Sequence, residues 1–382
     1  MFSFLKPNSY LGIDLGAGGV KMVELKQEKN RPLLFTYGLT VGEHNVHRLI
    51  ETPEKTVTEL RQEKSSKSAA SLDKKGRPQA DETKAEEYAQ LIKEVCRVAR
   101  TVSKKAVVSL PVSAVFHTVV NLPKMEKKDF NTVLRAEVKK FLPRPMEEMA
   151  LDFKVLPGEK ESKTEQVLVN AVPKELVAFY TTVFQKAGLE LEALEPESTA
   201  LARSLVGKDT AVNLVVDVGA ERTNFFIIDQ AAPVTHHSIE AGGHKMNQLL
   251  KNILGLEEDA VEQIKYDFSV YLDGNNSEIA SDDFLQIFNP VVEPIFREIE
   301  VSLDLYLRQS ANIGKRLEKV ILTGGAALLP YLSTFIANRF KLKCYVGDPW
   351  ARTVYQSGLK RILNKIGPRM SVAIGLALRN MI

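Results

Sequence analysis

One short pattern occurs twice in this chain, and the repetition constrains the fold more than any other feature. The segments GIDLGAGGVKMVEL (12–25) and VVDVGAERTNFFII (215–228) share Asp-x-Gly-Ala at one constant spacing. In each copy apolar strand residues precede the aspartate and a second strand-like run follows the turn. A single Asp-x-Gly turn is a weak indication, because Asp and Gly favour hairpin turns for conformational reasons alone. Two equivalent hairpins predict two related domains that face each other.

The small residues of both turns are suited to hold an anion. Glycine permits backbone torsions that direct successive N–H groups at one point, and small side chains let phosphate oxygens approach closely. Asp14 and Asp217 would repel a bare triphosphate, so they predict Mg²⁺ and its waters in between. Lys21 would neutralise phosphate charge, with a solvent-exposed strand lysine as the alternative. The turn residues are Gly16, Ala17, Gly18 and Gly19 in the first hairpin and Gly219 and Ala220 in the second.

A third glycine-rich turn lies in VILTGGAALLPYLS, where a predicted strand meets Gly324 and Gly325 and then a predicted helix. A glycine pair at the start of a helix lets a nucleoside lie against the backbone. Alone, the same pair is also compatible with a simple tight turn between a strand and a helix.

Composition narrows the classes of function. The chain has 382 residues and a formal net charge of +3, from 51 basic and 48 acidic residues. So small a net positive charge does not indicate a nucleic-acid-binding protein. Cys96 and Cys344 have neither a metal-binding spacing nor a disulfide framework, which favours a reducing compartment. No stretch approaches the ~20 apolar residues of a membrane span, so we expect a cytosolic protein that reaches a membrane only through a partner.

The remaining segments predict alternating strands and helices. A three-stranded meander is expected over 10–41, and a disordered polar insert over about 50–84, because that segment has too little apolar surface to offset its chain entropy. An apolar face predicts a helix over 127–142, formed by Phe130, Val133, Leu134, Val138, Phe141 and Leu142. The last helix is expected to start just after Pro368.

Together these motifs resemble the actin, Hsp70 and sugar-kinase superfamily. The resemblance implies an α/β, actin-like (RNase H-like) two-lobe fold, with duplicated mixed sheets flanked by helices and an FtsA-type extra subdomain. Helices near EPESTALAR and SVAIGLALRN would cross between the lobes. Lobe 1 is expected to comprise 1–111, 166–208 and 366–382, with an inserted subdomain at 112–165; lobe 2 is expected to comprise 209–245 and 311–365, with a helical subdomain at 246–310.

Several separated segments are similar to the type IV pilus assembly protein PilM family. They are FLKPNSYLGIDLGAGGVKMVEL, VDVGAERTNF, GDPWART and the long stretch from VVSLPVSAVF to ALDFKVL. The resemblance implies an ATP- and Mg²⁺-binding scaffold, cytoplasmic and peripheral to the inner membrane. It would dock the N-terminal cytoplasmic peptide of the inner-membrane protein PilN, without inserting into the membrane itself. Self-association and the rate of any ATP hydrolysis are left open.

The resemblance also assigns roles to matching positions. Residues 16–19 with Lys21 would form one phosphate loop, and Gly324 with Gly325 the adenosine motif. Asp14 and Asp217 would act through metal-bound water, and Glu197 or Ser198 would position an attacking water. The second phosphate loop would comprise Gly219, Ala220, Glu221, Arg222 and Thr223; Glu262 and Lys265 would approach the nucleoside; Phe116, Val119, Phe141 and Leu142 would contact the partner peptide.

Two other functions fit the same superfamily. A small-molecule kinase would need a general base and a shaped acceptor pocket, and no residue cluster in the sequence supplies them. A cell-division scaffold of the FtsA type would end in an amphipathic membrane helix, whereas this sequence ends at LALRNMI, directly after the second expected crossing helix. An Hsp70-like chaperone would need a substrate domain beyond the two lobes.

Overall fold

The computed structural model describes residues 9–29, 31–40, 42, 82–157, 163–255, 260–261, 281–309, 312–329 and 331–381. The predicted polar insert lies outside the described residues except for its last three positions, which begin helix α1 (Glu82–Ala99). Glu262 and Lys265, predicted to approach a nucleoside, also lie outside the described residues.

Lobe 1 is built on a five-stranded sheet in the order β3-β2-β1-β4-β8. The predicted meander is confirmed as β1 (Ser9–Gly16), β2 (Gly19–Glu28) and β3 (Arg31–Leu39), which pair antiparallel. Strands β4 (Lys105–Leu110) and β8 (Glu190–Pro196) extend the sheet in parallel. Helices α1 and α3 (Lys174–Ala187) pack on one face through a buried apolar cluster. The expected Gly188 ends α3 in the left-handed conformation, at φ +75°.

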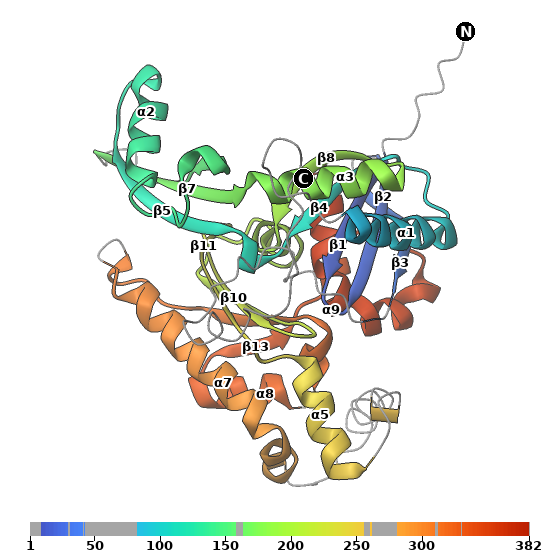
Figure 1. The fold of residues 1–382 in the computed structure, drawn as a ribbon. Coiled ribbons are helices and arrows are strands. Elements are labelled where there is room, and N and C mark those ends of the chain that lie inside the picture. The colour runs from blue at the N-terminus through green and yellow to red at the C-terminus, as the bar shows by residue number, and fades with distance from the viewer. Residues whose placement is uncertain are drawn as a thin grey trace, which may run out of the picture.

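Lobe 2 repeats this arrangement, with a second five-stranded sheet in the order β11-β10-β9-β12-β13. Its strands are β9 (Asn213–Val218), β10 (Thr223–Asp229), β11 (Ala232–Ile239), β12 (Lys319–Thr323) and β13 (Lys343–Val346). Helices α5 (Gly243–Leu254), α7 (Ser281–Leu307) and α8 (Leu332–Phe340) lie beside this sheet (Figure 1). The same strand order in both sheets confirms the duplication predicted from the two hairpins.

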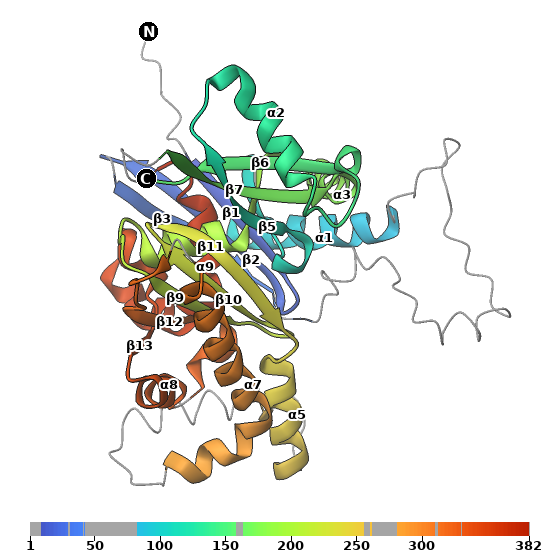
Figure 2. The same ribbon diagram turned by 90° about the vertical axis from the view of Figure 1, so that its left-hand side faces the viewer.

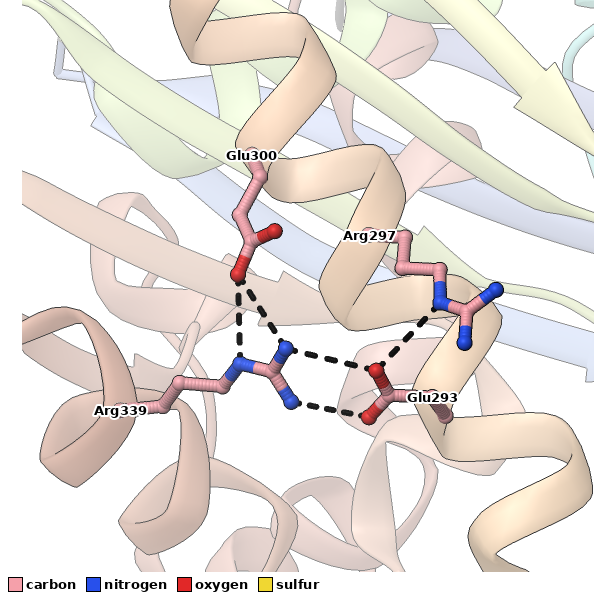
Figure 3. Close-up of polar contacts among 4 residues, drawn as sticks. All are labelled: Glu293, Arg297, Glu300 and Arg339. Atoms are coloured by element: carbon pink, nitrogen blue, oxygen red, sulfur yellow. Dashed lines mark hydrogen bonds and ion pairs between the residues drawn. The ribbon is translucent and has the colours of Figure 1, made fainter.

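A polar network holds α7 against α8 (Figure 3). Arg339 of α8 donates to Glu293 Oε2 at 2.8 Å and to Glu300 Oε1 at 3.2 Å, both on α7. Its guanidinium also lies 5.0 Å from the ring centre of Phe296, and Arg297 pairs with Glu293 at 3.4 Å. Because one arginine is shared by two carboxylates and a ring, the network fixes the two helices together more firmly than an isolated surface pair would.

A third sheet, in the order β5-β7-β6, is separate from the sheets of the two lobes (Figure 1). We call the segment 116–173 the inserted subdomain; it contains β5 (Phe116–Pro123), α2 (Lys127–Val138), β6 (Met149–Val155) and β7 (Thr164–Pro173). Its third strand runs past residue 165, where the sequence placed the end of the insertion.

The helix expected over 127–142 is shorter than predicted, because α2 ends at Val138. The α conformation is disfavoured for the residue before a proline, so Leu142, which precedes Pro143, is a poor continuation of the helix. The last turn tightens instead into shorter-range bonds, such as Phe141 N–H to the Val138 carbonyl at 3.0 Å. As a result Phe141 leaves the apolar face and is 53% exposed.

Two helices lie between the lobes, as the resemblance implied. Helix α4 (Glu197–Leu201) continues into a π-helical turn, Ala202–Val206, and α9 (Lys360–Ala377) packs against it. Small residues allow this contact, since a Cβ atom on Gly375 would lie 2.0 Å from the Ala200 carbonyl oxygen. An apolar cluster with members from both sheets encloses the two helices.

The predicted start of the last helix was wrong, because α9 begins at Lys360 and contains Pro368 in its interior. Tertiary packing outweighs the penalty for an internal proline. The residues before it are anchored by the indole of buried Trp350, which donates to the Leu363 carbonyl at 2.8 Å. The carbonyl of Pro368 itself accepts from Gly324 N–H at 3.0 Å and from Thr323 Oγ1 at 3.1 Å.

Glu24 is fully buried in lobe 1 and fixes the segment that leads into β4. Its carboxylate accepts from the N–H groups of Val102 at 2.9 Å and Ser103 at 3.0 Å, and from Ser9 Oγ. Glu24→Ala would leave these N–H and O–H donors without the buried carboxylate that accepts from them, so we expect a loss of about 3 kcal/mol in the free energy of unfolding. Urea denaturation checks this, with exposed Glu28→Ala as the control; equal midpoints for the two variants would contradict it.

Candidate functional site

A pocket of about 450 Å³ lies between the two lobes, and both predicted hairpins line it together with the end of β12. The structure therefore brings together motifs that are far apart in the sequence. Thr223 and Gly19 do not line the pocket: Thr223 Oγ1 donates to the Ala241 carbonyl, and Gly19 approaches Thr40 with φ +117°. The predicted residues that line it are Asp14, Gly16, Ala17, Gly18, Lys21, Glu197, Asp217, Gly219, Ala220, Glu221, Arg222, Gly324 and Gly325.

The tips of the two hairpins meet across the pocket. A Cβ atom on Gly18 would lie only 3.1 Å from the Cβ atom of Ala220. Gly324 completes the wall with φ +88°, and a Cβ atom there would lie 2.5 Å from Asp217 Oδ1. Since L-residues rarely adopt this φ, the backbone at 324 requires glycine. Glycine backbone thus forms part of the pocket wall, beside the polar and charged side chains that line the rest.

The carboxylate of Asp14 is held in place from both sides. Ser109 Oγ donates to Asp14 Oδ1 at 2.8 Å, and Lys21 Nζ lies 3.6 Å from Asp14 Oδ2. The lysine is not a solvated strand residue, because its side chain is 15% exposed. It folds back over the first turn, where a Cβ atom on Gly16 would lie 2.6 Å from Lys21 Nζ. Lys21 is therefore positioned at the mouth of the first hairpin.

Two further carboxyl groups share this site. Burial, with the charge of Asp14 as a second cause, raises the pKa of Asp217 to about 6, although a hydrogen bond from Asn224 and the charge of Lys21 oppose the shift. Burial raises the pKa of Glu197 well above its usual range, and the charges of Asp14 and Asp217 add to this. Asp217 and Glu197 therefore resist ionisation, and with the carboxylate of Asp14 beside them the site favours a cation. Among the described residues no group of three or more His, Cys, Asp or Glu side chains is arranged to hold a metal directly.

The second hairpin is fastened to the first turn of α5. Gly219 N–H donates to the Arg222 carbonyl at 2.9 Å and closes the turn. The first two N–H groups of α5, from Gly243 and His244, donate to the carbonyls of Gly219 and Ala220 at 2.9 and 2.8 Å. Any displacement of this hairpin is therefore transmitted to α5, and the reverse also holds.

A family model described as "Type IV pilus assembly protein PilM" matches residues 38–381. The chain belongs to the PilM family. It is similar to a solved structure described as a "PilM-PilN type IV pilus biogenesis complex", with a TM-score of 0.74, 23% identity and coverage of 98% of each chain. It is also similar to the ethanolamine utilization protein EutJ from Carboxydothermus hydrogenoformans, with a TM-score of 0.53, 17% identity and coverage of 99% of this chain and 92% of that one. These likenesses confirm the predicted actin-like two-lobe α/β fold.

For this member of the PilM family, the sequence reasoning missed several residues that line the pocket. Most of them come from the start of α5 and from α9, and no local motif marks those positions. Arg369, for example, packs over Gly325, whose Cβ atom would lie 3.0 Å from Arg369 Nε. The signal that could have found it is its position next to Pro368 in the second crossing helix. The missed residues are Gly42, Asn224, Gly243, His244, Asn247, Ala326, Pro368, Arg369, Ser371 and Val372.

The four residues predicted to contact a partner peptide lie in different surroundings. Phe116 is partly buried on β5, and Leu142 packs against the apolar core under α2. Phe141 is exposed, whereas Val119 packs against a small cluster that includes Ala232 of lobe 2. The inserted subdomain also carries Phe153, 42% exposed, which the sequence reasoning did not select. None of the helices in the described part of the chain is both long and apolar enough to cross a membrane.

Proposed function

We propose that this chain is an actin-like scaffold of the type IV pilus assembly machine, which binds Mg·ATP between its lobes and docks the N-terminal cytoplasmic peptide of PilN. The observation that carries the nucleotide part is the convergence of two glycine-rich hairpins and a Gly-Gly turn on one pocket. Membership of the PilM family and the similarity to a PilM-PilN complex support the pilus and partner parts. The chain would reach the inner membrane through this partner.

The residues that line the pocket fit a magnesium nucleotide. Its volume lies within the range of about 300–1,000 Å³ that is usual for small-molecule sites. The absence of Cβ atoms at Gly16, Gly18 and Gly219 lets phosphate oxygens approach the backbone of both hairpins closely. The carboxyl groups of Asp14 and Asp217 would hold Mg²⁺ through its waters, and the ion would neutralise the phosphates.

The other residues have supporting roles in this proposal. Lys21 would contact a phosphate from the first hairpin, while Gly324 and Gly325 would lie against the nucleoside. Ser109 would keep Asp14 in its orientation through the 2.8 Å hydrogen bond. Glu197 is the residue we propose for holding a water near the phosphates, since it is buried at the floor of the same pocket.

The proposed binding site for the PilN peptide lies on the inserted subdomain, which exposes aromatic side chains beside α2. Phe130 and Phe153 stack at 5.5 Å between ring centres, and Phe141 projects from the end of the helix. Exposed aromatic residues that cluster on one small subdomain are typical of sites that bind an apolar peptide. Phe116, Val119, Phe141 and Leu142 remain the residues that we propose to contact or support the peptide.

A peptide with the N-terminal sequence of the PilN partner is expected to bind the purified protein, and Phe141→Ala should weaken binding about tenfold, or ~1.4 kcal/mol. Phe35→Ala is the matched control, because Phe35 is 40% exposed but lies on β3 of lobe 1. Isothermal titration calorimetry measures both. If the wild-type protein does not bind the peptide, either with or without Mg·ATP, the proposed docking of PilN is contradicted.

A further inference from the structure

The inserted subdomain contacts lobe 2 directly, in addition to the contacts that the two crossing helices make. Strand β5 lies at one edge of its own sheet and β11 at one edge of the lobe 2 sheet. These two edges touch each other, and both views place β5 over β11 (Figures 1 and 2). Because an unpaired strand edge is otherwise exposed to solvent, the contact covers a part of both sheets that would be open in a lobe without the insertion.

Two histidines stand at the centre of this contact. The ring of His117 on β5 lies 4.9 Å from the ring of His236 on β11, with an angle of 30° between their planes. His117 Nδ1 is fixed by Asn170 Oδ1 of β7 at 2.9 Å. A small apolar cluster extends the contact on both sides, and its members are Leu156, Leu168 and Ala232, with Val119 and Val234 packed against them.

The histidine pair is uncharged at neutral pH. Burial lowers the pKa of His236 to about 3, and the neighbouring rings of His117 and His237 add to the shift. Burial also lowers the pKa of His117, although the carbonyls of Pro233 and Val234 oppose it; neither carbonyl meets His117 Nε2 with hydrogen-bond geometry. Charged groups that contact β11 nearby are Glu298, which lies 3.7 Å from His237, and Arg222, which donates to Ser238 Oγ at 2.8 Å. The contact is therefore held by packing rather than by an ion pair.

We propose that the contact between β5 and β11 is a latch that holds the two lobes together over the nucleotide pocket and slows both entry and exit of the nucleotide. The chain leaves lobe 1 after β4 and returns to it at α3, and Arg144 of the inserted subdomain pairs with Glu175 of α3 at 2.6 Å, which ties the subdomain to lobe 1. Strand β11 belongs to lobe 2. Any rotation of one lobe against the other must therefore shift the two histidines past each other. The proposal rests on the proposed nucleotide site.

The latch is joined to both proposed binding surfaces. Strand β11 leads through Gly242 into α5, whose first residues line the pocket and hold the second hairpin. Strand β5 presents His117 to lobe 2, while its neighbours Val120 and Leu122 pack into the core beneath α2. A ligand seated on the inserted subdomain would thus contact the same structural unit that closes the pocket.

The test measures the rates at which a fluorescent ATP analogue with Mg²⁺ binds to and leaves the full-length protein by stopped flow. We expect His236→Ala and His117→Ala each to raise both rate constants at least fivefold, because a freed lobe opens more often. The double variant should be no faster than the faster single variant, since both changes remove one contact. A variant whose pocket is damaged would instead show a higher dissociation rate constant with no increase in the association rate constant.

His237→Ala is the matched control, because it lies on the same strand but faces Glu298; its rates should stay within twofold of wild type. A thermal melt confirms that each variant is folded, and His236→Gln replaces His236→Ala if that variant does not fold. Rates within twofold of wild type for the folded latch variants would overturn the latch and leave the nucleotide site standing. A wild-type protein that binds no analogue would overturn both.

Discussion

The Gly219→Glu variant is expected to lose at least 100-fold in affinity for Mg·ATP, or about 2.8 kcal/mol. Gly219 lines the pocket at the second hairpin, and its backbone does not require the left-handed region. A Cβ atom there would lie 3.0 Å from the Arg222 carbonyl oxygen, so the turn must shift slightly, and the new side chain would place a further carboxylate beside Asp14 and Asp217. That charge repels the phosphates, and its volume fills the space that the bare backbone leaves for them.

Gly358→Glu is the control for this effect, since a Cβ atom at that position meets no atom within 4 Å and the residue is outside the pocket. Calorimetric titration of Mg·ATP compares the two variants with the wild-type protein. Unchanged affinity of a folded Gly219→Glu protein would show that the second hairpin does not face the phosphates.

The Gly12→Val variant is expected to lose about 3 kcal/mol or more in the free energy of unfolding. A Cβ atom on Gly12 would lie 2.1 Å from the Ala373 carbonyl oxygen and 2.5 Å from the Ala377 nitrogen. Both are backbone atoms of α9 and cannot rotate away, so the helix must move off the lobe 1 sheet. Inserted volume of this kind in a packed interior typically costs 1–3 kcal/mol, and occasionally more.

Gly358→Val serves as the control for the change of residue type, because that position is open. Guanidinium chloride denaturation measures the difference, and nucleotide affinity can be followed in the same samples. A midpoint equal to that of the control would mean that α9 does not approach β1 as closely as described.

The hairpins were predictable because their signal is local. Asp-Gly turn chemistry and flanking apolar runs define β1, β2, β9 and β10, and the repeated motif predicts that the lobes face each other. The pocket confirms that the turns at residues 16–18 and 219–222 come together with Gly324 and Gly325. Of the two alternatives that the sequence left open for Lys21, the solvent-exposed strand lysine does not fit its 15% exposure, and the phosphate contact stays a prediction.

What the sequence did not predict depends on tertiary packing. Strand β11 was missed because APVTHHSI lacks the regular alternation of apolar and polar residues, and it is stabilised by pairing with β10 and by its contact with β5. The start of α9 was misplaced because Pro368 is a local stop signal that packing overrides. Arg369 and the first turn of α5 reach the pocket only once the lobes are assembled.

The most direct test of the central claim is a crystal structure of the protein with Mg²⁺ and a non-hydrolysable ATP analogue. The account predicts that the phosphates lie between the turns at 16–19 and 219–222, with the ion next to Asp14 and Asp217 and the nucleoside against Gly324 and Gly325. An analogue bound anywhere else, or a pocket that stays empty at millimolar analogue, would contradict it.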